Sequence, residues 1–186
     1  MILKHYAGIG SRKTPEHIQK LMTWIAMLLS HGGWVLRSGG ADGSDTAFEK
    51  GADQDKIEIF LPRQGFNHNP SQLYKYKPIH HRLAMDTHPA WDGLDKGSKA
   101  MMIRNSAQIM GYEEGSIQTN FVLCWTQNGE AIGGTGQAIR LADRFKLPVL
   151  NLQKKDSARL KDPATFLEEG EKIITEILTW VNKRWP

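Results

Sequence analysis

The chain has 186 residues, of which 40% are hydrophobic and 24% are charged, and a formal net charge of +4. Its length is enough for one sizeable core, and its apolar content excludes an intrinsically disordered protein. No apolar run approaches the roughly 20 residues that span a bilayer. We therefore expect no membrane partner. Because the first residues read directly into a strand, we also expect no signal peptide, and we expect a protein of the reducing cytoplasm. Cys124 is the single cysteine, which excludes an internal disulfide and a cysteine-based zinc site.

The N-terminal part of the chain predicts strands that alternate with helices. The expected strands cover residues 2–7, 34–36 and 57–61. The helix after the first strand is expected to be capped by Thr14, with Pro15 at its first position, and the helix after the second strand by Ser44. Residues 63–96 lack a clear period and predict an insertion with a short helix of its own, for which a lid over the site is one role.

The C-terminal part continues the alternation. Helices are expected at 97–110, 136–145 and about 164–184, and strands at 121–125 and 148–152. Together these elements predict one Rossmann-like α/β domain over residues 1–186, with a doubly wound, mostly parallel sheet and helices on both faces. The helix at about 164–184 closes the domain.

Three glycine-rich turns directly follow expected strands and indicate where a ligand binds. Such turns lie at the carboxyl ends of the strands, where glycine lets backbone N–H groups approach an anion. In the first turn we assign ligand contacts to Gly8, Gly10, Ser11 and Arg12. The alternative is a tight turn with a solvated arginine. Lys13 stands where the dinucleotide fingerprint has its third glycine, so the sequence does not predict NAD-dependent redox chemistry.

The second turn brings carboxylates to the start of a helix. We assign ligand contacts to Ser38, Gly39, Gly40, Asp42, Ser44 and Glu49, and a catalytic role to Asp45. Acids at this position are stabilised as anions and accept hydrogen bonds from sugar hydroxyls or a base edge. Asp45 and Glu49 are four residues apart and can form a carboxylate pair. The alternative is that both acids only stabilise the helix dipole.

Two further segments complete the predicted site. Arg104 and Asn105 form a polar pair in an apolar helix, and we assign Arg104 a catalytic role and Asn105 a ligand contact. The third turn opens another helix, and we assign it ligand contacts from Gly133, Gly134, Thr135, Gly136 and Gln137. A surface loop is the alternative for this turn, and pairing with Glu113 or Glu114 is the alternative for Arg104.

The histidines of the insertion do not have the spacing of a metal-binding motif. His80, His81 and His88 have acids nearby, but their spacing matches no common metal site. We therefore expect no metal and no cofactor.

These residues together resemble the SLOG superfamily of Rossmann-like domains, which includes DNA-processing protein A-like proteins, LOG-type phosphoribohydrolases and small nucleotide-binding proteins. The turn that ends at Arg12 is similar to the family's first turn, and Ser38-Gly-Gly-Ala-Asp-Gly-Ser-Asp45 is similar to the turn of the DNA-processing and small branches. Arg104-Asn105 and Gly133-Gly-Thr-Gly136 resemble later family motifs. The resemblance implies a nucleotide ligand and pairing into a homodimer.

The third turn departs from the LOG-type enzymes. In those enzymes a glutamate and a helix arginine cleave an N-glycosidic bond. Arg104 can stand for the arginine, but Arg140 stands where the glutamate is expected, and Gln137 replaces a threonine.

Three functions remain open from the sequence. The first is nucleotide binding through the three turns, with hydrolysis of the N-glycosidic bond or of a phosphate ester by Asp45 and Arg104. The second is a non-catalytic sensor or sequestering protein for a nucleotide signal. The third is a single-stranded DNA binder like the DNA-processing proteins.

Overall fold

The computed structural model describes residues 4–112 and 119–186. Its centre is a five-stranded parallel sheet in the order β3-β2-β1-β4-β5. The strands are β1 (Lys4–Gly10), β2 (Trp34–Ser38), β3 (Ile57–Ile59), β4 (Phe121–Trp125) and β5 (Val149–Asn151). This arrangement confirms the predicted doubly wound α/β fold.

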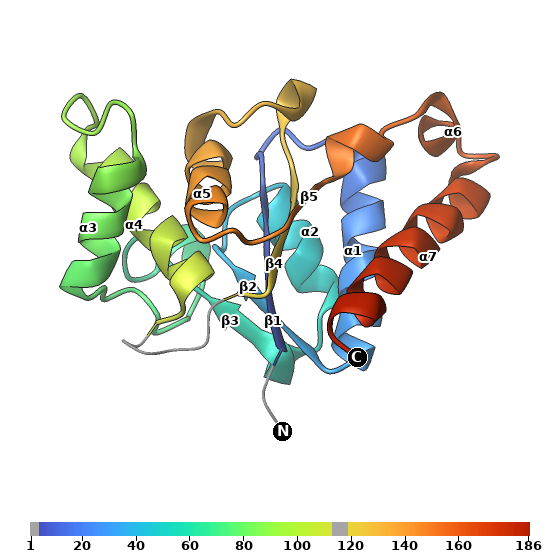
Figure 1. Cartoon of the computed structure of the whole chain (residues 1–186), viewed down its shortest axis with the longest axis horizontal. Helices are drawn as coiled ribbons and strands as arrows, with labels where there is room; N and C mark the ends of the chain where they lie inside the picture. The colour runs from blue at the N-terminus through green and yellow to red at the C-terminus, as the bar shows by residue number, and fades with distance from the viewer. Residues whose placement is uncertain (1–3, 113–118) are drawn as a thin grey trace.

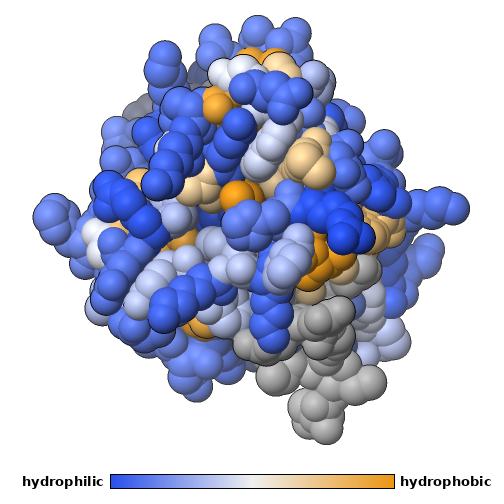
Figure 2. All heavy atoms as spheres, turned by 90° about the vertical axis from the view of Figure 1, so that its left-hand side faces the viewer, coloured by the Kyte–Doolittle hydropathy of each residue, from blue (hydrophilic) through white to orange (hydrophobic). Residues whose placement is uncertain are grey.

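Helices cover both faces of the sheet (Figure 1). One face carries α1 (Glu16–His31), α2 (Ser44–Gly51) and α7 (Phe166–Arg184). The other carries α3 (Pro78–Thr87), α4 (Lys96–Met110) and α5 (Gly133–Arg144). Short helical segments are η1 (Gln54–Lys56), η2 (Phe66–His68), η3 (Gln127–Gly129), η4 (Leu152–Lys155) and α6 (Ala158–Lys161). The outer surface over α3 and α4 is mainly hydrophilic, with small separate hydrophobic patches (Figure 2).

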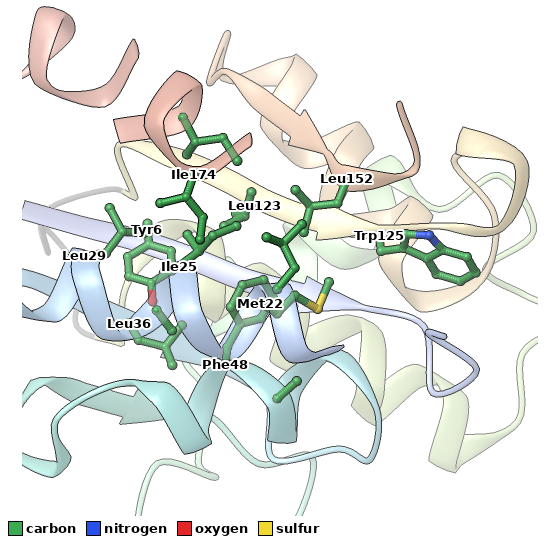
Figure 3. Packing of buried hydrophobic residues seen from close by; sticks show 14 of the residues in the cluster. Tyr6, Met22, Ile25, Leu29, Leu36, Phe48, Leu123, Trp125, Leu152 and Ile174 are labelled. Atoms are coloured by element: carbon green, nitrogen blue, oxygen red, sulfur yellow. The ribbon is translucent and has the colours of Figure 1, made fainter. Parts of the chain in front are cut away.

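Successive residues of the central strands pack into two different hydrophobic cores, one on each face of the sheet. Tyr6 belongs to the larger core against α1, α2 and α7 (Figure 3). Its ring stacks on that of Phe121, with 5.6 Å between the ring centroids. Ala7 belongs to the core against α3, α4 and α5. This alternation is what a strand buried on both faces requires. In the described part of the chain, no helix is long and apolar enough to cross a membrane.

Several predicted boundaries differ from the structure. β3 ends at Ile59 because Phe60 bridges to Leu73 of the insertion. α4 begins at Lys96, where the Asp95 side chain accepts a hydrogen bond from the Ser98 N–H. α5 begins at Gly133 instead of residue 136, so the third glycine turn is the first turn of this helix.

The two predicted helix caps are wrong. The N-caps of α1 and α2 are Pro15 and Gly43, and neither has a side-chain cap. The Thr14 hydroxyl instead donates to the Ser11 carbonyl at 2.7 Å and shares a 2.6 Å hydrogen bond with the Ser44 hydroxyl. Both hydroxyls are buried where the first two turns meet. They therefore join the turns to each other instead of capping helices.

Candidate functional site

A cleft of about 450 Å³ opens beyond the carboxyl ends of β1 and β4. These strands are neighbours, and the strand order reverses between them. The Ser11 N–H donates to the Trp125 carbonyl at 3.2 Å and ties the two strand ends together. Ligands in open α/β sheets bind at such a reversal.

Cationic groups lie on one wall of this cleft. Arg12 and Lys13 line it from the turn after β1, and both side chains are exposed. Within residues 4–112 and 119–186, neither side chain has an ion-pair or hydrogen-bond partner. Gly133, Gly134 and Thr135 bring the N-terminus of α5 to the same cleft. The first N–H groups of a helix lack intrahelical acceptors, so this end also favours an anion.

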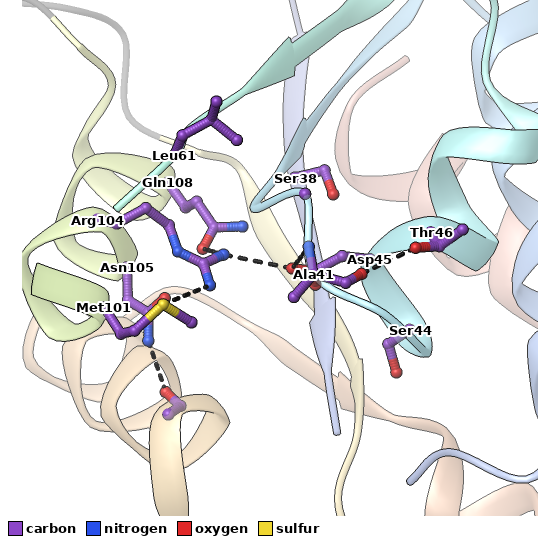
Figure 4. Close-up of polar contacts among 12 residues, drawn as sticks. Ser38, Ala41, Ser44, Asp45, Thr46, Leu61, Met101, Arg104, Asn105 and Gln108 are labelled. Atoms are coloured by element: carbon purple, nitrogen blue, oxygen red, sulfur yellow. Dashed lines mark hydrogen bonds and ion pairs between the residues drawn. The ribbon is translucent and has the colours of Figure 1, made fainter. Parts of the chain in front are cut away.

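A buried ion pair forms the inner wall (Figure 4). Nη1 of Arg104 lies 3.3 Å from Oδ2 of Asp45 and donates to Oε1 of Gln108 at 3.0 Å. The Ala41 N–H also donates to Oδ2 of Asp45, at 3.2 Å. All four residues are buried and line the cleft. Two donors of this wall, Nε of Arg104 and Nε2 of Gln108, are buried and have no hydrogen-bond partner within the described residues.

Burial changes the proton affinity of the carboxyl groups on α2. Desolvation raises the pKa of Asp45 above its usual value, and the nearby Arg104 guanidinium opposes this rise. Desolvation also raises the pKa of Glu49, to about 7, and the charge of Asp45 adds to the rise. Oε1 of Glu49 accepts from the Ser38 hydroxyl at 2.5 Å and from the Gly40 N–H at 3.1 Å. The Gly40 N–H therefore already has an acceptor within the protein.

Several residues of the second glycine turn are packed against, or hydrogen-bonded to, other residues of the protein. A Cβ at Gly39 would lie 1.1 Å from Nη1 of Arg104, and one at Gly40, where φ is +66°, would lie 2.9 Å from Leu61. Asp42 is exposed, and its carboxylate accepts from the Asn67 amide at 3.0 Å. These residues do not line the cleft. Packing and hydrogen bonding account for them without a ligand.

The third turn is held in place from two sides. The Asn105 amide donates to the Gly134 carbonyl at 2.8 Å and joins α4 to the start of α5. Gln137 is fully buried and donates to the Ala84 carbonyl of α3 at 3.1 Å. Arg140 donates from Nε to the Thr87 carbonyl and from Nη1 to the Ala131 carbonyl, each at 3.1 Å. Gln137 and Arg140 are the two residues at which this chain departs from the LOG-type motif. Both are hydrogen-bonded to other parts of this protein.

The structure brings about half of the sequence-predicted site residues to the cleft. Those that line it are Gly10, Ser11, Arg12, Asp45, Arg104, Asn105, Gly133, Gly134 and Thr135. Those outside its lining are Gly8, Ser38, Gly39, Gly40, Asp42, Ser44, Glu49, Gly136 and Gln137. Gly8 is a packing position, because a Cβ there would lie 2.7 Å from Leu36. Residues 63–96, for which a lid was one expected role, contribute no lining residue in the described structure.

Sequence reasoning missed several cleft residues. They include Lys13, Ser98, Met101, Met102, Gln108, Thr126, Gln127 and Ile132. Gln108 carried a usable signal, because residues four apart on a helix face each other and Arg104 precedes it by four. Ile132 carried none, because an isolated apolar residue before a glycine turn fits many structures.

Comparisons with known proteins identify the fold and no family. No protein-family model matches the chain, and a search of curated proteins finds no significant relative. Among solved structures, the chain is similar to DNA processing protein A from Helicobacter pylori, whose structure was described for its single-stranded DNA binding mode. The TM-score is 0.50 at 16% identity, over 95% of this chain and 80% of that one. At this identity the similarity concerns the fold.

Proposed function

We propose that the cleft binds a nucleotide or nucleotide-derived molecule through its phosphate. The observation that carries this proposal is the meeting of three cationic features in one cleft. Arg12 and Lys13 form no ion pair with any described residue, although the charge of Arg12 also acts on the Asp45 carboxyl. The N-terminus of α5 opens beside them. Arginine offers a fork of donors that fits phosphate oxygens, and helix N–H groups add to it.

The proposal has a catalytic part, which is hydrolysis of the bound nucleotide at its N-glycosidic bond or phosphate ester. Its support is the Asp45 carboxyl, which lines the cleft, is buried and has a raised pKa. A carboxyl with a raised pKa is suited to exchange protons with substrate or water, and such groups cluster at active sites. Arg104 is already bound to Asp45 and Gln108. Its role in the proposal is therefore to orient Asp45 toward the sugar or the bond to the base.

Single-stranded DNA is the second candidate ligand. It is favoured by the similarity to DNA processing protein A from Helicobacter pylori, whose structure was described for its single-stranded DNA binding mode. It is disfavoured by the cleft, because the described lining contains no aromatic side chain on which bases could stack.

Calorimetric titration tests the proposal. The ligands are the nucleoside mono-, di- and triphosphates and a short oligonucleotide, and the variants are Arg12→Ala and the matched control Arg82→Ala. Arg82 is an exposed arginine of α3 outside the cleft. We expect Arg12→Ala to weaken nucleotide binding about tenfold or more, which corresponds to ~1.4 kcal/mol, and Arg82→Ala to leave it unchanged. Equal effects of both variants, or no nucleotide binding, would refute the proposal.

Product analysis tests the catalytic part separately. Release of free base and of inorganic phosphate is followed with each nucleotide that binds. Asp45→Asn should abolish release while retaining binding, because the loss falls on the transition state. Binding without any product would leave a sensor or sequestering protein.

A further inference from the structure

The cleft has an apolar wall next to its cationic wall. Five large hydrophobic residues are exposed in the described chain: Met27, Ile79, Met85, Ile132 and Leu167. Of these, Ile132 lines the cleft, and 55% of its surface is exposed. Met101 and Met102 of α4 line the same cleft. Single exposed apolar residues are common on proteins. Here Ile132 is exposed, Met101 is half-buried and only 7% of Met102 is exposed, and the three side chains together line one side of the cleft as an apolar wall.

The position of the two methionines is defined by their neighbours. Nη2 of Arg104 lies 4.0 Å from the Met101 sulfur, so Met101 is held beside the buried ion pair (Figure 4). A Cβ at Gly134 would lie 3.7 Å from the terminal methyl of Met102. Met102 therefore reaches the first turn of α5, and Ile132 directly precedes that turn. The apolar wall and the proposed phosphate position thus adjoin at the start of α5.

We infer that the apolar wall of Met101, Met102 and Ile132 holds the base of the bound nucleotide, so that the cleft selects whole nucleotides over sugar phosphates. This inference rests on the proposed phosphate site. A base is a flat group joined to a phosphate through one sugar, which suits two adjoining walls. Methionine is polarisable and adapts to flat rings, and packing on it needs no aromatic partner. The cleft volume of about 450 Å³ falls within the range of roughly 300–1,000 Å³ typical of small-molecule sites.

The test compares two ligands that share a phosphate and differ in the base. Dissociation constants are measured for ribose 5-phosphate and for each of the four ribonucleoside 5′-monophosphates. The variants are Ile132→Ala and Met101→Gln, because an alanine at the N-cap of α5 removes apolar surface without adding an acceptor for the helix N–H groups. Their matched controls are Leu167→Ala on α7 and Met85→Gln on α3, because these residues are exposed and lie outside the cleft.

We expect the favoured monophosphate to bind at least about tenfold more tightly than ribose 5-phosphate. Ile132→Ala and Met101→Gln should each weaken binding of the monophosphate several-fold and leave binding of ribose 5-phosphate unchanged, whereas Arg12→Ala should weaken both. The controls should change neither. If both ligands bind equally tightly and Ile132→Ala changes neither affinity, the base site is overturned and the phosphate site stays intact. Failure of both ligands to bind would overturn the proposed function and this inference with it.

Discussion

The guanidinium of Arg104 lies so close to Gly39 that a Cβ at position 39 would be 1.1 Å from Nη1. The same nitrogen pairs with Asp45 and with Gln108. A glycine at position 39 thus makes room for an arginine from the opposite side of the cleft. Its role is steric: the absence of a side chain lets Arg104 of α4 reach Asp45 beside the second turn, and the wall of the cleft depends on that contact.

Gly39→Ala should therefore destabilise the fold. The added methyl group must displace Arg104, which separates a buried charge from its partner and costs about 3 kcal/mol of unfolding free energy. Urea denaturation measures this loss. The control is Gly93→Ala, where a Cβ would make an ordinary contact at 3.7 Å and stability should be unchanged. An equally stable Gly39→Ala protein would show that Arg104 does not occupy this space.

The ion pair should give a coupling free energy in a double-mutant cycle. Asp45→Asn leaves a buried guanidinium without its counter-charge, and Arg104→Met leaves a buried carboxylate, so each single change should cost about 3 kcal/mol or more. Removing both charges should cost less than the sum, by at least ~1 kcal/mol. Denaturation of the four proteins provides the cycle. Strict additivity would mean that the two side chains do not interact in solution.

Glu49 should make stability fall as pH rises. Burial raises its pKa from 4.5 to about 7, so between these values the folded protein holds a proton that the unfolded chain has lost. Unfolding is then favoured as pH increases through this interval. Glu49→Gln can keep the bonds from Ser38 and Gly40, because both go to Oε1. We expect Glu49→Gln to weaken this decline, measured by denaturation between about pH 5 and pH 8.

The control for this measurement is Glu171→Gln, because Glu171 is an exposed glutamate of α7. It should leave the pH dependence of the wild type unchanged. A wild-type stability that rises steadily over the same interval, with no difference in Glu49→Gln, would contradict the raised pKa.

Salt dependence should separate a mononucleotide site from a DNA-binding groove. A protein that contacts several phosphates of single-stranded DNA loses roughly 0.7 log units of affinity per tenfold salt for each contact. One phosphate held by Arg12, Lys13 and α5 should give a shallow slope, and oligonucleotides should bind weakly. Fluorescence anisotropy across a salt series measures both. Tight oligonucleotide binding with a steep slope, and no mononucleotide binding, would favour the single-stranded DNA alternative.

The fold could be predicted from the sequence because its signals are local. Buried strands end in glycine turns, and helices such as α1 carry apolar residues on one face, so the alternation of elements follows from the order of residues. The site could be predicted only in part. Arg12, Asp45 and Arg104 were found because charged residues beside glycine turns or in apolar helices are conspicuous.

The remaining site features depend on contacts between distant segments. Gly39 and Gly40 look like phosphate-binding glycines in sequence, and only the positions of Arg104 and Leu61 show that protein atoms fill the adjoining space. Thr14 and Ser44 have the residue types of helix caps, but they are 30 residues apart and bond each other. No local pattern encodes such a contact.

The most direct test of the proposed function is a crystal structure of the protein with the nucleoside monophosphate that binds most tightly. We predict the phosphate between Arg12 and the N-terminus of α5, with its oxygens accepting hydrogen bonds from the guanidinium and from N–H groups of Gly134 or Thr135. Asp45 should face the sugar or the bond to the base. A nucleotide bound elsewhere on the molecule, with Arg12 and the α5 N-terminus free of phosphate, would contradict the account.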